Sequence, residues 1–283
     1  MFRHGGTLQD ALGRIVHKQI AVEWRYFDYD NPNEVKGYLT VYRNYPSVME
    51  IALAPHDLHE VKDDATLRSY ANSMAAYKRP VFLRFASEMN GGWTSYHKDP
   101  ALYRRTFRLV HDVMVRNAPN VVMIWCVGSK PDHNWDDYYP GDKYVDWVGV
   151  NFYSVLHRNN DPKQPADKET IASNLDGIYR KYAARKPIAI CEYGASRQER
   201  IDLTADHSKW AAARLSELIT LLPRKYPRVK MVGLFNVNTI PLKFGSSSPK
   251  SNNYCFTDNP TVYRAVQQGL ASNYYLSHVP DSP

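Results

Sequence analysis

The chain has 283 residues, of which 43% are hydrophobic, and this length suits a single (β/α) barrel with a substantial core. No apolar run is long enough to cross a bilayer, so we expect no membrane span. The formal net charge of +7 comes from scattered lysines and arginines rather than from a dense basic run, which argues against a nucleic-acid partner.

Short apolar runs typical of strands alternate along the chain with segments of helical periodicity. Strands are predicted over residues 20–27, 49–54, 81–85, 121–127, 147–152, 188–191 and 231–237. Helices are predicted over residues 7–16, 65–78, 103–116, 173–181 and 209–222. Continuous apolar strands that alternate with helices indicate a parallel sheet buried on both faces, so the predicted fold class is α/β, a (β/α)8 TIM barrel.

An eight-stranded barrel requires one strand before these seven. Only residues 1–6 are available for it, and they are short and polar, so we expect the first strand to be lacking or shortened. The second and eighth strands would then present unpaired edges, which favours self-association unless something covers them. No repeat or linker divides the chain, so one barrel domain over residues 1–283 is expected, with a flexible loop at 245–251.

Two glutamates follow predicted strands at the same end of this barrel. The run RFASEMNGGW covers residues 84–93, and the run ICEYG covers residues 190–194. When the lacking strand is counted as the first, Glu88 follows the fourth strand and Glu192 closes the seventh. Both carboxylates therefore belong to the carboxyl-terminal face, where barrel enzymes carry their active sites.

Paired carboxylates of this kind are what retaining glycoside hydrolysis requires. One protonates the leaving oxygen, the other attacks the sugar, and the two lie about 5–5.5 Å apart. A general acid needs a partly apolar setting to keep its proton near neutral pH, and Trp93 and Phe85 are candidate neighbours of Glu88. The nucleophile must stay ionised, and the guanidinium of Arg84 favours that form.

These segments resemble glycoside hydrolase family 26, which is best known for β-mannanases and belongs to a clan of (β/α)8 glycosidases with catalytic glutamates after strands four and seven. The family signature is an Arg, a His-Glu-Met-Asn-Gly run and a Trp; this chain has Arg84, SEMNG over residues 87–91, and Trp93. The likeness runs from about residue 20 to residue 238 and includes YPGDKYVDWVGVN over residues 139–151. By this resemblance, Glu88 is the general acid/base and Glu192 is the nucleophile.

The chain departs from the family pattern at Ser87, where the mannanases place His. By resemblance, that His holds the acid/base and contacts bound sugar, and a hydroxyl can neither carry its positive charge nor reach as far. We therefore expect hydrolase chemistry on an altered substrate.

The remaining candidates for substrate binding lie near the same predicted strand ends. The chain holds 21 Tyr and 6 Trp against 9 Phe, and rings with a polar edge suit both stacking on sugars and hydrogen bonding. The predicted substrate-binding residues are Arg84, Ser87, Asn90, Trp93, Trp125, Asn151, Tyr153, Tyr193 and Trp24. Tyr26, Asn236 and Asn238 are further candidates, and barrel core remains the alternative for each Trp.

No metal or cofactor is expected. The histidines in predicted loops, His97, His133 and His157, lack paired ligand spacing, and the three cysteines form neither a zinc motif nor a disulfide framework. No signal peptide opens the sequence, so the protein is either secreted with its leader removed, which we favour, or cytoplasmic. The sequence does not indicate an oligomeric state.

The function predicted from these features is a retaining endo-glycoside hydrolase. Its partner would be a β-linked polysaccharide or oligosaccharide: β-mannan, β-1,3-xylan, β-glucan or an exopolysaccharide, with the basic charge leaving room for an acidic one. The alternative from another class is a non-catalytic polysaccharide-binding protein on a degenerate barrel. A weaker third reading is a glycosyl-transferring enzyme that uses the same covalent intermediate.

Overall fold

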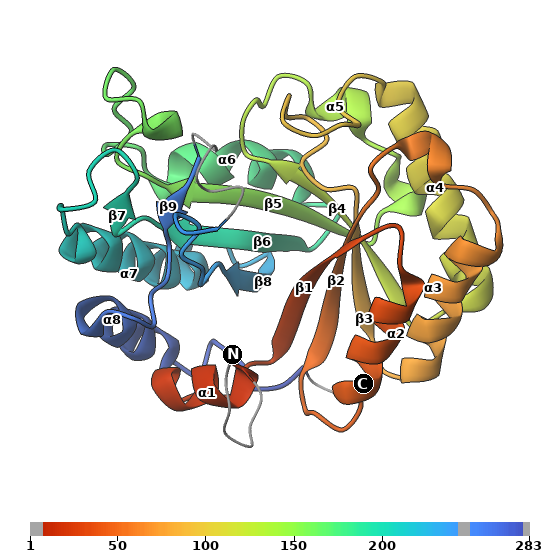
Figure 1. Cartoon of the computed structure of the whole chain (residues 1–283), viewed down its shortest axis with the longest axis horizontal. Helices are drawn as coiled ribbons and strands as arrows, with labels where there is room; N and C mark the ends of the chain where they lie inside the picture. Colours follow the sequence, from red (N-terminus) through yellow and green to blue (C-terminus); the bar gives the residue numbers. More distant parts are fainter. Residues whose placement is uncertain (1–7, 243–249, 280–283) are drawn as a thin grey trace. The chain divides into compact units, whose positions relative to one another are not determined.

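The computed structural model describes residues 8–242 and 250–279 of the chain, and its elements are labelled in Figure 1. The strand order is β1-β2-β3-β4-β5-β6-β8, with β1 and β8 at the two ends. The chain forms two compact units. We call Ala21–Asn151, Tyr182–Ala189 and His278–Pro283 the Glu88 unit, and Met1–Ile20, Phe152–Lys181 and Ile190–Ser277 the Glu192 unit.

The Glu88 unit is a parallel sheet with helices between consecutive strands. It contains β1 (Val22–Asp28), β2 (Val48–Ala54), β3 (Val81–Phe85), β4 (Val121–Gly128) and the first half of β5 (Trp147–Ser154), paired in parallel and in sequence order. Helices α2 (Pro32–Val41), α3 (Ala65–Tyr77) and α4 (Pro100–Asn117) lie side by side along these strands (Figure 1). A short helix, α5 (Trp135–Tyr138), follows β4.

Capping residues fix where the helices of this unit begin. The Asp64 side chain accepts a hydrogen bond from the backbone N–H of Leu67 (3.1 Å), and helix α3 starts at Ala65, directly after Asp64. The Asp99 side chain does the same for Leu102 (2.8 Å) ahead of α4, and Pro100 fits the first helical turn, where its missing N–H costs nothing. Strand β3 is buried along its whole length, as an apolar strand under helices must be.

The Glu192 unit contains the rest of the strands and the later helices. The backbone N–H of Ser196, directly after β6 (Ile188–Ala195), donates to the carbonyl of Ser154 at the end of β5 (2.9 Å). The backbone N–H of Phe235, directly after β8 (Val229–Leu234), donates to the carbonyl of Tyr193 on β6 (2.7 Å). The helices are α1 (Leu8–Val16), α6 (Ile171–Tyr182), α7 (Ser208–Lys225) and α8 (Pro260–Leu270). A two-stranded antiparallel sheet pairs β7 (Gln198–Glu199) with β9 (Asn252–Asn253).

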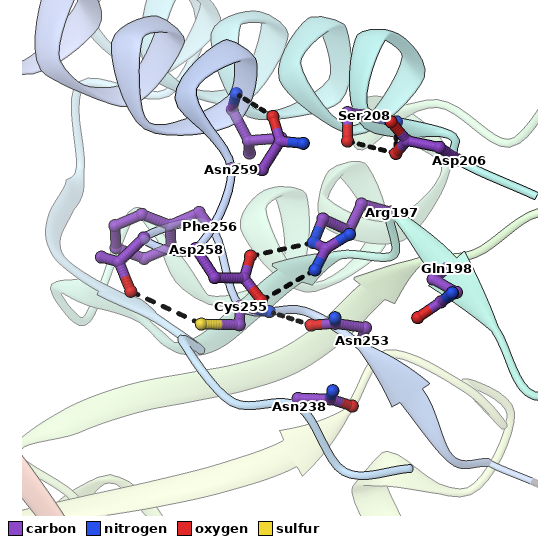
Figure 2. Close-up of polar contacts among 12 residues, drawn as sticks. Arg197, Gln198, Asp206, Ser208, Asn238, Asn253, Cys255, Phe256, Asp258 and Asn259 are labelled. Carbon is purple, nitrogen blue, oxygen red and sulfur yellow. Dashed lines mark hydrogen bonds and ion pairs between the residues drawn. The ribbon is translucent and has the colours of Figure 1, made fainter. Parts of the chain in front are cut away.

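An ion pair fastens the segment after β6 to the segment before α8. Figure 2 shows Arg197 directed at Asp258, to which it donates two hydrogen bonds, from Nε (2.9 Å) and from Nη2 (2.8 Å). Next to it, the backbone N–H of Cys255 is bonded to the side-chain oxygen of Asn253 (2.9 Å). Planar two-point pairing of this kind fixes orientation as well as distance, so the segment leading into α8 is held by side chains as well as by backbone.

The parallel strand order with alternating helices confirms the predicted α/β class, and all seven predicted strands are present. The prediction for residues 1–6 lies outside the described residues, and so does most of the expected loop at 245–251. Within the described residues, no helix is long and apolar enough to cross a membrane.

Candidate functional site

Glu88 stands on a tight turn directly after β3. Its backbone N–H is bonded to the carbonyl of Cys126 on β4 (2.9 Å), and its φ is +60°. Ala86, two residues earlier, also has a positive φ, of +46°. Left-handed backbone at non-glycine residues is unfavourable and persists where surrounding contacts impose it, which is commonly at functional sites.

Two donors hold the carboxylate of Glu88. The Asn151 side chain on β5 donates from Nδ2 to Oε1 (2.8 Å), and the Trp93 indole donates from Nε1 to Oε2 (2.5 Å). Both oxygens of the carboxylate are thereby oriented by groups from different segments of the unit. This is the kind of support that positions a proton-transferring side chain.

A buried ion pair adjoins this carboxylate. Arg84 on β3 has no exposed surface, and its Nε lies 2.8 Å from Oε1 of Glu50 on β2, which is itself 1% exposed. The guanidinium also donates from Nη1 to the side-chain oxygen of Asn151 (3.4 Å). The rings of Trp24 and Tyr26, on β1, each lie 5.3 Å from the guanidinium carbon, so aromatic faces complete its surroundings.

Two glycines leave the space that the Trp93 ring occupies. A Cβ added to Gly91 would lie 2.3 Å from the ring, and a Cβ on Gly128 would lie 3.3 Å from it. Asn90 between them is buried and fastens the turn, because its side chain bonds both N–H (2.8 Å) and C=O (2.9 Å) of Gly128 and the carbonyl of Pro131 (2.8 Å). The predicted substrate-binding residue Asn90 therefore uses its amide to join the loop after β3 to the loop after β4.

Glu192 lies on β6 and is 2% exposed. The hydroxyl of Tyr153, on β5, donates a hydrogen bond to Oε2 of Glu192. The Tyr153 ring packs against Tyr254 (4.9 Å between ring centroids) and Phe235 (5.4 Å). The carboxylate is thus held by a phenol whose own ring is fixed in an aromatic cluster.

Trp125 and Tyr193, both predicted to bind substrate, are placed in the core instead. Trp125 has no exposed surface and packs between Tyr139 (4.9 Å) and Tyr182 (5.5 Å). Tyr193 is equally buried and bonds Ser154 through its hydroxyl (2.9 Å). Successive side chains on a strand alternate between its two faces. Trp125 therefore faces the opposite side of its strand from Cys126, which contacts Asn151. Tyr193 likewise faces the opposite side from Glu192, which contacts Tyr153.

The other predicted residues near the strand ends have mixed surroundings. Ser87 is half-buried, and its carbonyl accepts a hydrogen bond from the hydroxyl of Tyr96 (2.9 Å). The side-chain oxygen of Asn236 accepts a hydrogen bond from the backbone N–H of Phe256 (2.9 Å), and that of Asn238 accepts one from the backbone N–H of Ile240 (3.1 Å). Trp93 and Tyr26 are each 49% exposed, which leaves ring surface for a ligand.

The loop histidines do not form a metal centre in the described parts of the chain, 8–242 and 250–279, where no group of three or more His, Cys, Asp or Glu side chains could hold an ion. His157 instead pairs through Nδ1 with Oε2 of buried Glu199 (2.6 Å). The other oxygen of Glu199 accepts the backbone N–H groups of Leu156 (2.9 Å) and His157 (2.8 Å). This carboxylate ties the loop after β5 to the segment after β6.

Sequence reasoning missed Glu50, Glu199 and the ring cluster around Tyr153. Glu50 left a readable signal, since it is a lone carboxylate inside the apolar strand VMEIALA. Buried charges are almost always paired, so this residue required a cationic partner on a neighbouring strand. Glu199 is on a two-residue strand that no sequence pattern marks.

The profile of glycosyl hydrolase family 26 matches residues 21–168, slightly more than half of the chain. The chain belongs to glycosyl hydrolase family 26. This confirms the resemblance seen in the Arg84–Trp93 run.

The relatives of this family 26 protein differ in their named activities. Beta-1,3-xylanase TXYA of a Vibrio species is 27% identical over 146 residues, which are 50% of this chain and 29% of that protein. Mannan endo-1,4-beta-mannosidase of Bacillus subtilis is 30% identical over 127 residues, 41% of this chain and 30% of that protein. The matched part spans about three tenths of the length of each relative.

Solved structures match this family 26 chain over nearly its whole length. The catalytic domain of the GH26 endo-beta-1,4-mannanase of Bacillus sp. JAMB-750 has a TM-score of 0.66 at 15% identity, covering 97% of this chain and 83% of that one. A GH26 beta-mannanase from Bacteroides ovatus has a TM-score of 0.61 at 14% identity, covering 93% and 82%. At such low identity these matches bear on the fold, and they confirm the predicted TIM-barrel class.

Proposed function

We propose that this family 26 protein is a retaining endo-glycoside hydrolase, with Glu88 as general acid/base and Glu192 as nucleophile. The observation that carries the proposal is the support given to each carboxylate. Glu88 receives donors from Asn151 and Trp93, and Glu192 receives the hydroxyl of Tyr153. Glu192 lies within strand β6 and Glu88 on the turn after β3, and a carboxylate held by donors in such a place is pre-oriented for reaction.

The reaction follows from the two roles. Glu192 attacks the anomeric carbon while Glu88 gives its proton to the departing glycosidic oxygen, which forms a covalent glycosyl-enzyme. Glu88, now ionised, takes a proton from water, and that water displaces Glu192 with net retention of configuration. The hydroxyl of Tyr153 holds Glu192 in position for attack and remains bonded to it when the carboxylate is released.

The proposed substrate is a β-linked polysaccharide, with β-1,3-xylan and β-mannan as the first candidates, because the relatives carry those two names. Trp93, Trp24 and Tyr153 would stack on sugar rings, and Asn151 and Arg84 would orient Glu88. Ser87 in place of the family His favours a substrate other than plain mannan. A polymer does not cross membranes unaided, so we expect action outside the cell.

The testing experiment is a reducing-sugar screen over β-1,3-xylan, mannans, β-glucans and acidic exopolysaccharides, with Glu88→Ala and Glu192→Ala beside the native protein. Glu60→Ala is the matched control, since Glu60 is an exposed carboxylate at the end of the short 3-10 turn after β2. We expect release by the native protein and the control, and loss of at least about a thousandfold in both site variants.

Two further measurements separate the roles. Azide should restore turnover of an activated glycoside by Glu88→Ala, because the glycosyl-enzyme still forms and needs no general base when the nucleophile is an anion. A fluorinated activated glycoside should label Glu192, identified by peptide mass spectrometry. Binding to a polymer with no release by the native protein would contradict the hydrolase proposal and favour a binding protein.

A further inference from the structure

The strongest unassigned feature is the carboxylate of Glu50. It lies in the middle of β2, is 1% exposed, and meets Arg84 with an Nε–Oε1 separation of 2.8 Å. An ionised side chain this deep requires a reason, since replacing a buried pair by apolar residues is often neutral or even stabilising. Its place next to the Glu88 cluster supplies one.

The contacts run without a break from Glu50 to Glu88. Glu50 pairs with the guanidinium of Arg84, which donates to Asn151 Oδ1 (3.4 Å), and Asn151 Nδ2 donates to Glu88 Oε1 (2.8 Å). Arg84 is therefore separated from the Glu88 carboxylate by one amide group. Glu50 and Arg84 lie on the parallel neighbours β2 and β3, with Ala52 opposite Arg84, and Asn151 lies on β5, so three of the four side chains stand on strands of one sheet.

An arginine at this distance creates an electrostatic problem for a general acid. A positive charge favours ionised Glu88, whereas the proposed role requires Glu88 to be protonated when substrate binds. The orienting bonds from Asn151 and Trp93 act in the same direction, since donors favour the charged form. A second negative charge next to the arginine offsets this effect.

We propose that Glu50 is a positioning residue that compensates the charge of Arg84, so that Arg84 can hold Asn151 against Glu88 while Glu88 keeps its proton near neutral pH. This rests on the proposed role of Glu88. Arg84 supplies the geometry, and Glu50 offsets the effect of its charge on Glu88. The pair, which has no net charge, holds Asn151 in place without adding a positive charge near Glu88.

Tyr96 and Cys126, two further titratable groups near Glu88, do not supply the same compensation. Tyr96 is neutral because burial, and then the charge of Glu88, raise its pKa well above the usual value. The Cys126 thiol donates its hydrogen to Asn151 Oδ1 (3.2 Å). Arg84 and Glu50 are therefore the charged neighbours from β3 and β2.

The test is the titration of Glu88 itself, followed by carbon-13 NMR of protein labelled at the glutamate side-chain carboxyl. The signal is assigned by its loss in Glu88→Gln. In Glu50→Gln, which keeps the size of the side chain and removes its charge, we expect the midpoint of Glu88 to fall by about one pH unit. Glu60→Gln removes an exposed, solvent-screened carboxylate and should leave the midpoint in place.

A second variant guards against loss of folding, because Glu50→Gln removes a carboxylate that pairs with a buried cation. The double variant Glu50→Gln with Arg84→Met removes both charges, and we expect the Glu88 midpoint to return to within about half a unit of the native value. A midpoint that is unchanged in Glu50→Gln, with only the thermal midpoint of unfolding lowered, would overturn the inference and leave Glu50 a structural residue.

Activity distinguishes this failure from failure of the proposed function. On the polymer that gives most release in the screen, Glu50→Gln should move the alkaline limb of kcat/KM to lower pH by the same unit as the NMR midpoint. If Glu88→Ala abolishes release but the limb does not move in Glu50→Gln, the inference is wrong and the acid/base role stands. If Glu88→Ala keeps full release, the proposed function is wrong, whatever the titration shows.

Discussion

Of the two glycines that leave space for the Trp93 ring, Gly91 is the closer to it. In Gly91→Ala, the new Cβ would lie 2.3 Å from the ring, closer than real contacts allow, so the exposed indole must swing away and lose its bond to Glu88. We expect turnover to fall about tenfold with little change in stability, because a half-exposed ring contributes little core packing.

Gly92→Ala is the matched control for this prediction. Its added Cβ would meet only the His97 ring, at 3.9 Å, which is ordinary contact. Turnover and the thermal midpoint should match those of the native protein. Equal losses of turnover in the two variants would mean that the loop backbone, rather than the indole position, is what Gly91 protects.

Single residues also show where sequence reasoning stops. Glu88, Arg84 and Trp93 could be found because they follow a buried strand in a readable run. Trp125 lies in the same predicted strand-end region, but the direction of its side chain depends on which face of β4 it occupies. That face becomes known only when a neighbour such as Cys126 is seen to touch Asn151.

At the scale of elements, the Asn90 side chain makes three of the hydrogen bonds that join the loop after β3 to the end of β4 and the loop after it. Asn90→Ala would leave the buried N–H of Gly128 without its side-chain partner and remove two further bonds, to the carbonyls of Gly128 and Pro131. Unsatisfied buried groups of this kind cost about 1–3 kcal/mol each, so we expect about 2–3 kcal/mol less free energy of unfolding. Chemical denaturation measures this directly.

The control for Asn90 is Asn117→Ala, which removes one bond to the carbonyl of Val113 (2.8 Å) at the end of α4. We expect a change within about 0.5 kcal/mol, since alanine is the better helix former. Should Asn90→Ala unfold at the same denaturant concentration as native protein while sugar binding weakens, Asn90 would be a ligand contact rather than a clamp.

Strand β1 contains Glu23, whose ionisation we expect to affect stability. Burial raises the pKa of this carboxyl to about 7, against a smaller opposing effect of Arg25. The folded state then holds a proton that the unfolded state releases above about pH 4.5. The stability contributed by this group is full below that pH and is lost as pH rises through about 7.

Glu23→Gln should therefore raise the free energy of unfolding at about pH 8, by on the order of 1–3 kcal/mol, and have little effect at about pH 4. Denaturant titrations at the two pH values measure both numbers. A variant that is less stable than native protein at the higher pH would show that ionised Glu23 has a favourable partner.

The strands could be predicted from the sequence more completely than the helices, for physical reasons. Strands β2, β3, β4 and β6 are mostly apolar and mostly buried, which gives them a clear sequence signal. Strands β1 and β8 mix polar and apolar residues and are less buried, yet all seven strands appear at or near their predicted limits. Helices α2 and α8 were not predicted: α2 contains Gly37 and ends in Thr40 and Val41, which are weak helix formers. Helix α8 did carry a signal, an Asn259 cap followed by Pro260.

At the scale of the whole molecule, buried tyrosines couple folding to alkaline pH. Burial, assisted by the charge of Asp30, raises the pKa of Tyr70 to about 12, and burial with the hydrogen bond to Asp176 raises that of Tyr226 to about 12. Burial raises the pKa still further for Tyr29, Tyr103, Tyr193 and Tyr254. The unfolded chain ionises these phenols near pH 10, so their contribution is full below that pH and is lost as pH rises toward 12.

We therefore expect the thermal midpoint to be nearly constant from about pH 7 to pH 9 and to fall steeply above about pH 10, where each buried phenol adds one proton to the difference between the states. The sequence pI of 9.1 places the smallest net charge just below this transition, so self-repulsion does not cause its onset. Near-ultraviolet absorbance of phenolate during an alkaline titration measures the ionisation. Tyr226→Phe should ionise one tyrosine fewer and show a shallower fall, whereas full phenolate absorbance near pH 10 in still-folded protein would contradict the prediction.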